Sequence, residues 1–222
     1  MRIDVVTIFP EIIDAYMNAS IMKRAQAKGV VSIYAHNLRD YTTDKHRKVD
    51  DRPYGGGAGM VLMPEPILRA VDAITKKAPK TKKRKVIILS AKGKQYTQKM
   101  ARTLAKNYSH LVFITGRYEG IDERVKKVLR AEEISMGPYV LTDGDVPAMA
   151  VVSSVVRLLP GAIAEESLSE ESHGTEDECE YPHYTRPEAI AFKGKKYRVP
   201  KILRSGDHKQ IEGWRQKQRK EL

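Results

Sequence analysis

Cysteine is nearly absent from this sequence, since Cys179 is the only one in 222 residues. A single cysteine excludes an intrachain disulfide, and none of the six histidines has the Cys/His spacing of a zinc site. No stretch approaches about 18 uninterrupted apolar residues, and the first residues, MRIDVVTIF, lack the pattern of a signal peptide. We therefore expect a soluble, cytoplasmic protein with no structural metal site and no membrane contact.

Two common nucleotide-binding patterns are also missing, G-x-G-x-x-G and G-x-x-x-x-G-K-[ST], so neither a dinucleotide nor a triphosphate is indicated. Glycine is instead concentrated in KVDDRPYGGGAGMVL, residues 48–62. Glycine allows a positive φ angle and lets a ligand approach backbone N–H groups closely. This stretch is therefore either a tight turn or a ligand-binding loop.

Positive charge dominates, with 40 lysines and arginines against 28 aspartates and glutamates. The net charge of +12 has the sign expected for a protein that binds a polyanion. Residues 163–180 contain eight acidic and no basic residues, whereas residues 183–222 contain twelve basic and four acidic ones. This change predicts a large domain at 1–162, an acidic linker at 163–180 and a small basic module at 181–222.

Apolar segments typical of strands alternate with helical patterns along the large domain. Strands are predicted at residues 2–9, 30–36, 85–90, 111–116 and 132–136. Helices are predicted at residues 10–29, 65–74, 97–107 and 121–130, and near Pro147. Strands and helices in turn predict an α/β fold, with a mainly parallel sheet covered by helices on both faces.

Three of the predicted strands run into turns that carry glycine and small polar residues. The segments are ILSAKGKQ, ITGRYEGIDER and ISMGPYVLTDGDVPAM. Ligands collect at the carboxyl ends of the strands in such sheets, so the pattern favours a cofactor held by loops. The alternative is that the glycines only cap helices and turns. The glycines concerned are Gly93, Gly116, Gly120, Gly137 and Gly144.

Five motifs together resemble the bacterial tRNA (guanine-37-N1)-methyltransferases of the knotted α/β (SPOUT) superfamily. They are FP at 9–10, DKHRKVDDRPYGGGAGM, ITGRYEGIDERV, GPYVLTDGDVPAM and YPHYTRP, and the match extends to about Arg215. The resemblance implies a homodimer that uses S-adenosylmethionine, with active-site halves from different subunits, and Mg²⁺ for activity. It also implies a trefoil knot as the cofactor pocket and a small α-helical C-terminal domain that binds tRNA.

The resemblance implies a catalytic base in the acidic linker. Guanine N1 is a poor nucleophile until its proton leaves, so the reaction needs a nearby base and a cation at O6. SEESHG offers Glu171 where the family has aspartate before serine, although an ungapped count back from PHYTRP places Ser172 there. Glu170 and Asp177 are competing acids. Arg157 in VVRLLPG matches the family arginine that faces the guanine, and without the resemblance it would be interpreted as solvent-exposed.

The resemblance further implies which residues surround the adenosyl group, with Glu119 suited to a ribose hydroxyl. Ala91 departs from a usual proline, and Asp143 departs from a usual glycine, for which aspartate tolerates left-handed geometry better than most residues. The cofactor-binding residues implied are Leu89, Ser90, Ala91, Gly116, Tyr118, Glu119, Gly120, Ile134, Ser135, Gly137, Tyr139, Leu141, Gly144 and Pro147.

For the substrate, the resemblance implies that the glycine loop lies against a flipped guanine and that the basic module contacts the anticodon arm. Ala58 replaces a common proline in this loop. The loop residues implied are Asp50, Asp51, Arg52, Tyr54, Gly55, Gly56, Gly57 and Gly59. The module residues implied are Tyr184, Arg186, His208, Trp214 and Arg215.

Two other functions stay open at this point. One is a related knotted methyltransferase that acts on ribosomal RNA, and the other is a catalytically silent RNA-binding relative, which a wrong assignment of Glu171 would favour. All three alternatives predict RNA as the partner, and none predicts DNA.

Overall fold

The computed structural model describes residues 1–79, 83–164 and 180–219. The chain divides into two compact units, Met1–Ile163 and Ala164–Leu222, which we call unit 1 and unit 2. No helix within the described ranges is long and apolar enough to span a lipid bilayer.

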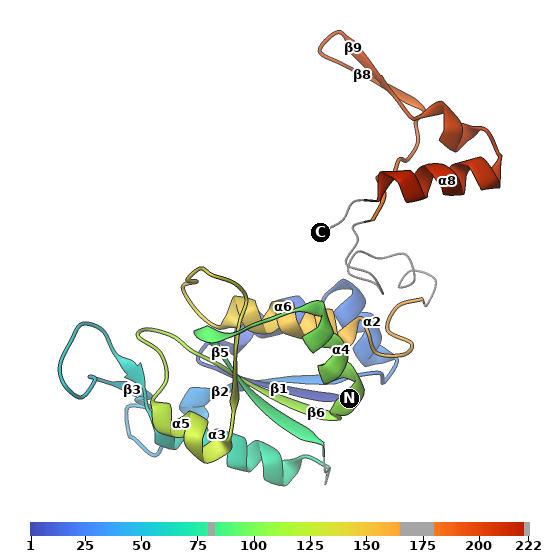
Figure 1. Cartoon of the computed structure of the whole chain (residues 1–222). Helices are drawn as coiled ribbons and strands as arrows, with labels where there is room; N and C mark the ends of the chain where they lie inside the picture. The colour runs from blue at the N-terminus through green and yellow to red at the C-terminus, as the bar shows by residue number, and fades with distance from the viewer. Residues whose placement is uncertain (80–82, 165–179, 220–222) are drawn as a thin grey trace. The chain divides into compact units, whose positions relative to one another are not determined.

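A five-stranded parallel sheet in the order β2-β1-β6-β5-β7 forms the centre of unit 1 (Figure 1). Its strands coincide with the five segments that the apolar runs predict, so the α/β class and the parallel sheet are confirmed. The strands are β1 (Arg2–Thr7), β2 (Ser32–Asn37), β5 (Arg84–Gln95), β6 (His110–Thr115) and β7 (Glu132–Ser135).

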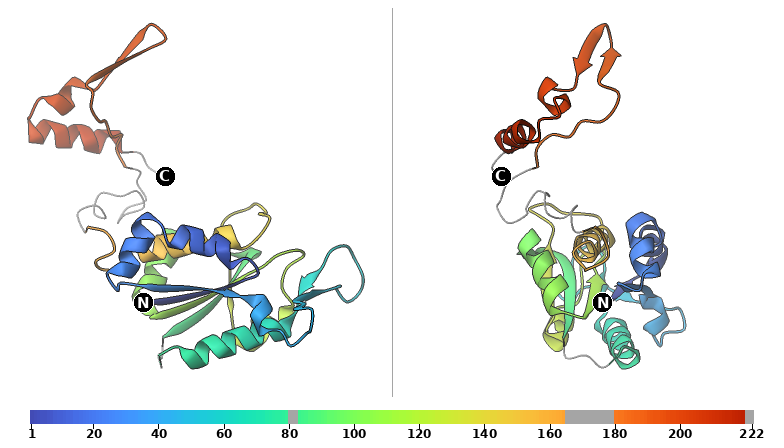
Figure 2. Two further views of the ribbon diagram at one scale, coloured as in Figure 1. Left: turned by 180° about the vertical axis from the view of Figure 1, so that it is seen from behind. Right: turned by 90° about the vertical axis from the view of Figure 1, so that its right-hand side faces the viewer.

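Helices cover both faces of this sheet, as predicted (Figure 2). Side chains alternate along β6, so that Leu111 and Phe113 face one layer of helices while Val112 and Ile114 face the other. The first layer contains α1 (Pro10–Met17), α2 (Ser20–Ala27), α4 (Gln98–Asn107) and α6 (Asp145–Val156). The second layer contains α3 (Pro64–Lys77) and α5 (Glu123–Leu129).

The single helical segment expected between Pro10 and Gly29 is wrong, because two helices occupy it. Asn18 ends α1, and its side-chain amide donates a hydrogen bond of 2.9 Å to the Asp14 carbonyl. Asparagine competes in this way with the regular backbone bonds of a helix, so the chain turns before α2 begins. The apolar period alone does not reveal this break.

The strand β5 continues past its predicted end at residue 90. Leu89 and Lys94 both pair with Ile134, so residues 90–93 bulge out of the ladder between them. Gly93 lies in this bulge, and a Cβ atom there would be 2.6 Å from the backbone carbon of Glu133. Only glycine allows so close an approach, and the bulge directs the chain toward the carboxyl ends of the strands.

A buried polar cluster is centred on Asp4, the third residue of β1, and includes the first residues of β5 and β6. Asp4 is fully buried, and its two carboxylate oxygens lie 2.7 Å from Nε2 of His36 and Nε2 of His110. Arg2 donates to both oxygens, at 2.7 and 2.8 Å, and Arg84 donates to Nδ1 of His110 at 3.1 Å. These bonds satisfy a carboxylate that burial alone would destabilise.

Unit 2 contains α8 (His208–Gln218), a short 3-10 helix η2 (Lys201–Arg204) and a two-stranded hairpin, β8 (Ala189–Phe192) with β9 (Lys195–Arg198). Asp207 caps α8 by accepting a 3.0 Å bond from the backbone of Gln210. The small helical domain implied by the resemblance therefore also carries a hairpin, which the sequence analysis did not predict.

Candidate active site

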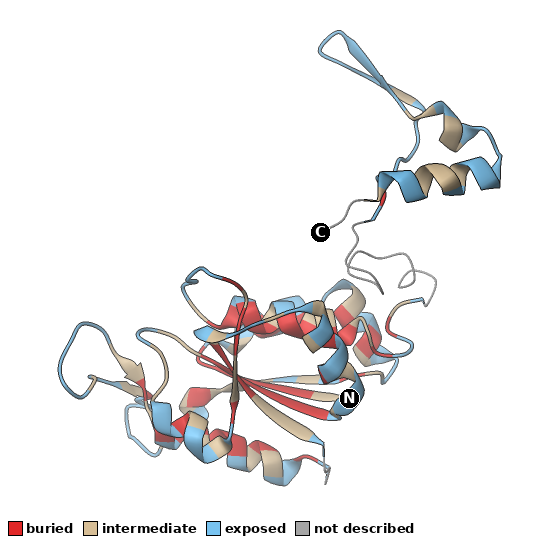
Figure 3. Cartoon of the chain, in the orientation of Figure 1, coloured by how far each residue is buried: buried red, intermediate tan, exposed pale blue. Residues whose placement is uncertain are grey.

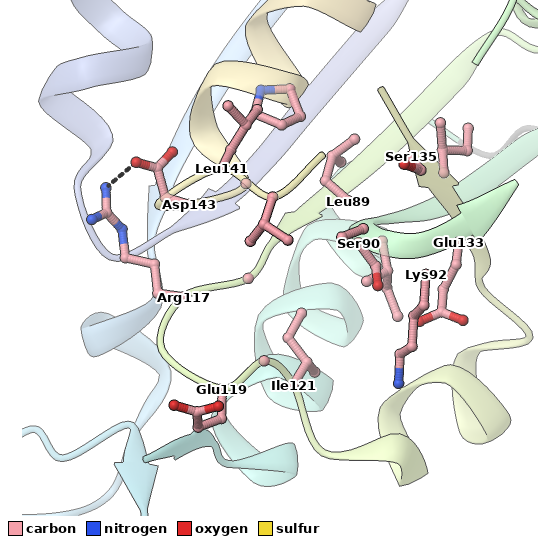
Figure 4. Close-up of a pocket in the computed structure, with 18 of the residues that line it drawn as sticks. Leu89, Ser90, Lys92, Arg117, Glu119, Ile121, Glu133, Ser135, Leu141 and Asp143 are labelled. Atoms are coloured by element: carbon pink, nitrogen blue, oxygen red, sulfur yellow. Dashed lines mark ion pairs between the residues drawn. The ribbon is translucent and has the colours of Figure 1, made fainter. Parts of the chain in front are cut away.

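A cavity of about 400 Å³ lies at the carboxyl ends of β5, β6 and β7. The residues that line it come from three segments, 88–92, 116–126 and 133–147. Figure 4 shows Leu89, Leu141 and Ile121 around it, with Ser135 and Glu133 on another side. All the residues implied to bind the cofactor line this cavity except Gly137, which lies in the adjoining turn, where a Cβ atom would be 2.6 Å from the Tyr139 ring.

Two of these segments cross with their backbones in contact. The amide of Gly144 donates to the carbonyl of Gly116 at 2.9 Å. A Cβ atom on Gly144 would lie 2.8 Å from the Gly116 nitrogen and 3.0 Å from Cα of Thr115. Gly144 is therefore more than a helix cap, because its lack of a side chain allows the crossing that forms one wall of the cavity.

Asp143 does not adopt the left-handed geometry considered for it, since it is absent from the described residues with positive φ. Its Oδ1 atom instead accepts bonds from the backbone of Asp145 at 2.8 Å and of Val146 at 3.3 Å. These N–H groups belong to the first turn of α6, where they have no partner within the helix. The aspartate thus holds the start of α6 beside the cavity.

Arg117 is a lining residue that the sequence analysis did not assign, although it lies inside the motif ITGRYEGIDER. Its Nη2 atom lies 2.7 Å from Oδ2 of the fully buried Asp145. The same atom lies 3.5 Å from Oδ2 of Asp143, and Figure 4 marks this ion pair. Its guanidinium also lies over the ring of Phe9, 4.3 Å from the centroid. One side chain thus joins the loop after β6, the start of α6 and the turn after β1.

The cavity lining contains both charged and apolar side chains. Lys126 contacts Glu133 at 2.5 Å, and Lys92 lies 3.4 Å from Glu123. The hydrogen bond that Lys126 donates to the Glu133 carboxylate raises the pKa of Lys126. The apolar part contains Leu89, Ile134, Leu141 and Pro147. The cavity can therefore hold a ligand that combines a flat apolar group with charged groups.

The glycine stretch forms the loop of a small hairpin that is fixed to the cavity. Strands β3 (Asp50–Asp51) and β4 (Val61–Leu62) are antiparallel. The amide of Glu119 donates to the Met60 carbonyl at 3.0 Å, and the amide of Leu62 donates to the Gly120 carbonyl at 2.9 Å. Gly59 packs so tightly that a Cβ atom would be 2.5 Å from Oε1 of Glu119. The loop implied to hold substrate and the loop implied to hold cofactor are therefore joined.

Side chains near the glycines differ in how firmly they are held. Asp51 accepts a 2.8 Å bond from the Arg52 amide, which lowers the pKa of its carboxyl group, and it pairs with Lys48 at 3.2 Å. Tyr54, by contrast, is 99% exposed. Gly55, Gly56, Gly57 and Gly59 have φ angles of 85°, 81°, 119° and 79°. Asp51 therefore fixes the loop, while Tyr54 is available to a partner.

Arg157 does not lie at the cavity. It follows the last residue of α6, whereas Gly144 and Pro147 line the cavity at the first turn, and a helix of twelve residues is about 18 Å long. Arg157 lines a separate hollow of about 330 Å³ with Tyr16 and Ser153. Glu171, the other catalytic candidate, lies outside the described residues. Within the described residues, Arg157 is therefore not brought to the cavity.

The implied tRNA contacts of unit 2 fall into two groups. Tyr184 and Trp214 are neighbours, with ring centroids 6.4 Å apart, and Arg215 lies over Tyr181, 4.8 Å from its centroid. Arg186 and His208 are exposed, and His208 is the first residue of α8. The structure thus brings Tyr184, Trp214 and Arg215 onto elements that pack together.

No three histidine, cysteine, aspartate or glutamate side chains within the described ranges gather as ligands for a metal ion. The magnesium requirement implied by the resemblance stays a prediction.

Comparison with known proteins is consistent with this geometry. The sequence profile described as tRNA (Guanine-1)-methyltransferase TrmD matches residues 1–222. A tRNA (guanine-N(1)-)-methyltransferase of Carboxydothermus hydrogenoformans is 48% identical over 218 residues, covering 98% of this chain and 82% of that protein. Proteins of the same name from Anoxybacillus flavithermus and Dictyoglomus turgidum are 50% and 51% identical, covering 98% of this chain and 86% and 84% of theirs. The chain therefore belongs to the tRNA (Guanine-1)-methyltransferase TrmD family.

Proposed function

We propose that this protein methylates N1 of guanine 37 in tRNA, next to the anticodon, with S-adenosylmethionine as the methyl donor. The observation that carries the proposal is the cavity at the carboxyl ends of the sheet, with a glycine loop bonded to its wall. When bound, the cofactor supplies a methyl group already activated by the sulfonium. The protein then has to position the guanine and take its proton.

The cavity residues suit this cofactor in size and in chemistry. A volume of about 400 Å³ lies within the usual range for small-molecule sites. Leu89, Ile134 and Leu141 can pack on the adenine, and the Glu119 carboxylate can accept bonds from ribose hydroxyls. The absence of side chains at Gly116 and Gly144 lets a ligand approach the backbone closely there.

The remaining chemistry requires a base and a cation, which we assign to Glu171 and Arg157. Glu171 takes the proton from N1, and Arg157 stabilises the negative charge that develops on O6. Arg157 is remote from the cavity of its own chain, so we propose that both residues act at the cavity of a second subunit. The domain roles follow: residues 1–162 hold the cofactor in a trefoil knot, 163–180 carry the base and 181–222 bind tRNA.

An exposed apolar face supports the homodimer. Ile12 and Tyr16 of α1 and Val146 of α6 are all exposed, and the Tyr16 hydroxyl donates to Ser153 of α6 at 3.0 Å. Monomeric proteins rarely leave such neighbouring apolar side chains uncovered. Because Tyr16 also lines the hollow of Arg157, a second copy on this face would lie next to that arginine.

Methyl transfer to defined RNAs tests the proposal. We expect transfer to an unmodified tRNA transcript with guanine at positions 36 and 37, none when 37 is adenine, and a severe loss when 36 is changed. A pocket that hydrogen-bonds guanine leaves its polar groups unpaired against adenine, which costs several kcal/mol, on the order of a 10⁴-fold loss. Methylation of ribosomal RNA in place of tRNA would support the related methyltransferase, and cofactor binding without turnover would support the silent relative. The cytoplasmic location stays a prediction.

A further inference from the structure

The β8–β9 hairpin of unit 2 contains none of the residues that the resemblance implies to contact tRNA. Its two-residue turn consists of Lys193 and Gly194, with φ angles of 47° and 73°, the geometry that joins two tightly paired strands. The hairpin extends away from η2 and α8 of the same unit in each view (Figures 1 and 2). A lone two-stranded hairpin is only marginally stable in water. Its contribution to folding therefore does not explain which side chains it carries.

Apolar and aromatic side chains gather on one face of this hairpin. Ile190 pairs with Tyr197, and Phe192 pairs with Lys195, and residues that pair across strands, or lie two apart, share a face. Ile190, Phe192 and Tyr197 are 54%, 61% and 52% exposed, and Figure 3 colours nearly the whole hairpin as exposed. Uncovered aromatic side chains on a protruding element indicate a binding surface.

The charge around this face indicates what covers it. Residues 188–204 contain six basic residues and one acidic residue, Glu188. Glu188 is engaged by Arg204 and lies 4.0 Å from Arg198. Within the described part of the chain, no carboxylate forms an ion pair with Lys195 or Lys196. Protein interfaces are depleted in lysine at their core, whereas aromatic side chains among cations suit bases and phosphates.

We propose that the β8–β9 hairpin is an RNA-binding arm. Lys195 and Lys196, on opposite faces near the tip, contact phosphates, and Phe192 and Tyr197 stack on unpaired bases. The choice of tRNA as this RNA rests on the proposed function. The arm is separate from the Tyr184 and Trp214 pair, so unit 2 contacts RNA at two places.

Removal of the two lysines tests the electrostatic part. The full-length double variant Lys195→Ala, Lys196→Ala should bind an unmodified tRNA transcript roughly tenfold more weakly at moderate salt. The slope of log affinity against log salt should become shallower by about 1.5, because each lost phosphate contact contributes about 0.7 to 0.9. The matched control is Lys99→Ala, Lys106→Ala, which removes two exposed lysines of α4 in unit 1 and should leave the slope unchanged.

Replacement of the aromatic ring tests the stacking part. Phe192→Ala and Phe192→Leu should both weaken tRNA binding by roughly tenfold without a change in salt slope, because leucine is apolar but cannot stack on a base. Phe192→Tyr should restore the affinity. Cofactor affinity and thermal unfolding should match the wild type in all these variants.

The outcomes separate this inference from the proposed function. If the wild-type protein neither binds nor methylates tRNA, the proposed function fails before the variants are needed. If the wild type is active and the lysine and phenylalanine variants bind tRNA with wild-type affinity, the proposal that the hairpin binds RNA is wrong. Two results would show that the face packs on protein and would overturn the proposal. One is full tRNA affinity in Phe192→Leu, and the other is a variant that changes the oligomeric state but not the affinity for tRNA.

Discussion

The two ends of α6 belong to one short helix but meet different surroundings. Its first turn is held by Asp143, contains the buried Asp145 and lines the cavity with Pro147. Its last residue leads to Arg157, beside a hollow and the exposed Tyr16. The first end lines the cavity, whereas the second end places Arg157 in a separate hollow, away from that cavity. If Arg157 acts as proposed, cofactor binding needs one chain and catalysis needs two.

Gly144→Ala should have the largest effect, because it disrupts the backbone contact between Gly144 and Gly116 beside the first turn of α6. The added Cβ atom would lie 2.8 Å from the backbone of Gly116, and backbone cannot move aside as a flexible side chain can. Overpacking of this kind costs about 1–3 kcal/mol and here distorts the cavity wall. We expect cofactor affinity to fall beyond detection by calorimetry, and the melting temperature to fall by several degrees.

Gly56→Ala is the matched control for that change. Gly56 has a φ of 81° and no atom within 4 Å of an added Cβ, so alanine is strained but meets nothing. The cost should be about 1 kcal/mol, with cofactor affinity unchanged. Equal loss of cofactor binding in both variants would mean that glycine matters for backbone freedom at both places and not for the crossing at Gly144.

Arg157→Ala changes only the second end of α6, so it should lower turnover without changing the cofactor cavity. Loss of the cation at O6 should lower turnover by roughly 100-fold or more, with cofactor affinity retained. Single-turnover kinetics with saturating tRNA, beside calorimetry with the cofactor, measure the two properties separately. Glu171→Gln should give the same pattern, and Glu170→Gln serves as its control. Equal losses in turnover and cofactor affinity on removal of Arg157 would contradict the separation.

Mixed dimers sharpen the comparison further. A subunit with Arg157→Ala keeps its cavity, and a subunit with Gly144→Ala keeps its arginine, so a heterodimer should contain one working site. Random mixing of equal amounts puts about half of the subunits in heterodimers, so about a quarter of wild-type turnover should return. Leu141→Arg, which fills the cavity from an exposed lining position, replaces Gly144→Ala if that subunit folds poorly. No recovery in co-purified heterodimers would show that Arg157 serves its own chain.

The sequence is sufficient for the sheet and for the cavity lining, because both depend on local patterns. Apolar runs mark all five strands of the sheet. The glycine-bearing segments in the bulge of β5 and after β6 and β7 then lie close together because those strands are parallel. The sequence pattern does not explain why residue 144 has to be glycine. A Cβ atom there would clash with Thr115 and Gly116, which are distant along the chain.

The sequence does not predict three other features, because each depends on short segments or on contacts between segments that are distant along the chain. The hairpin strands AIAF and KKYR are four residues each and have no second layer, so no buried alternation marks them. Arg117 carries no signal beyond its motif, because its partners Asp145 and Phe9 come from two other segments. The length of α6 predicts that Arg157 lies away from the cavity. It does not predict at which subunit's cavity Arg157 acts.

Arg117→Lys should weaken the first end without abolishing it. Lysine keeps the charge near Asp145 but cannot stack flat on Phe9 and reach the carboxylate at the same time. We expect the KM for the cofactor to rise roughly tenfold with kcat changed less than threefold, and Arg117→Ala to raise KM further. A fall in kcat at unchanged cofactor affinity would instead place Arg117 in contact with the substrate.

Asp4→Asn should leave both ends of α6 intact and change stability alone, because none of the residues that bond to Asp4 lines the cavity or the hollow of Arg157. Burial opposes ionisation of Asp4, but hydrogen bonds from His110, His36 and Arg2 outweigh it and hold the pKa of this carboxyl group below its usual value. A lowered pKa in the folded state stabilises the protein above the usual aspartate value of about 3.9, and this contribution is lost as the pH falls below that value. Chemical denaturation should therefore show a gap of about 2 kcal/mol between wild type and variant near pH 7, which narrows below about pH 4. A gap that stays constant down to pH 3 would mean that the charge of Asp4 contributes nothing and that its shape and hydrogen bonds account for its role.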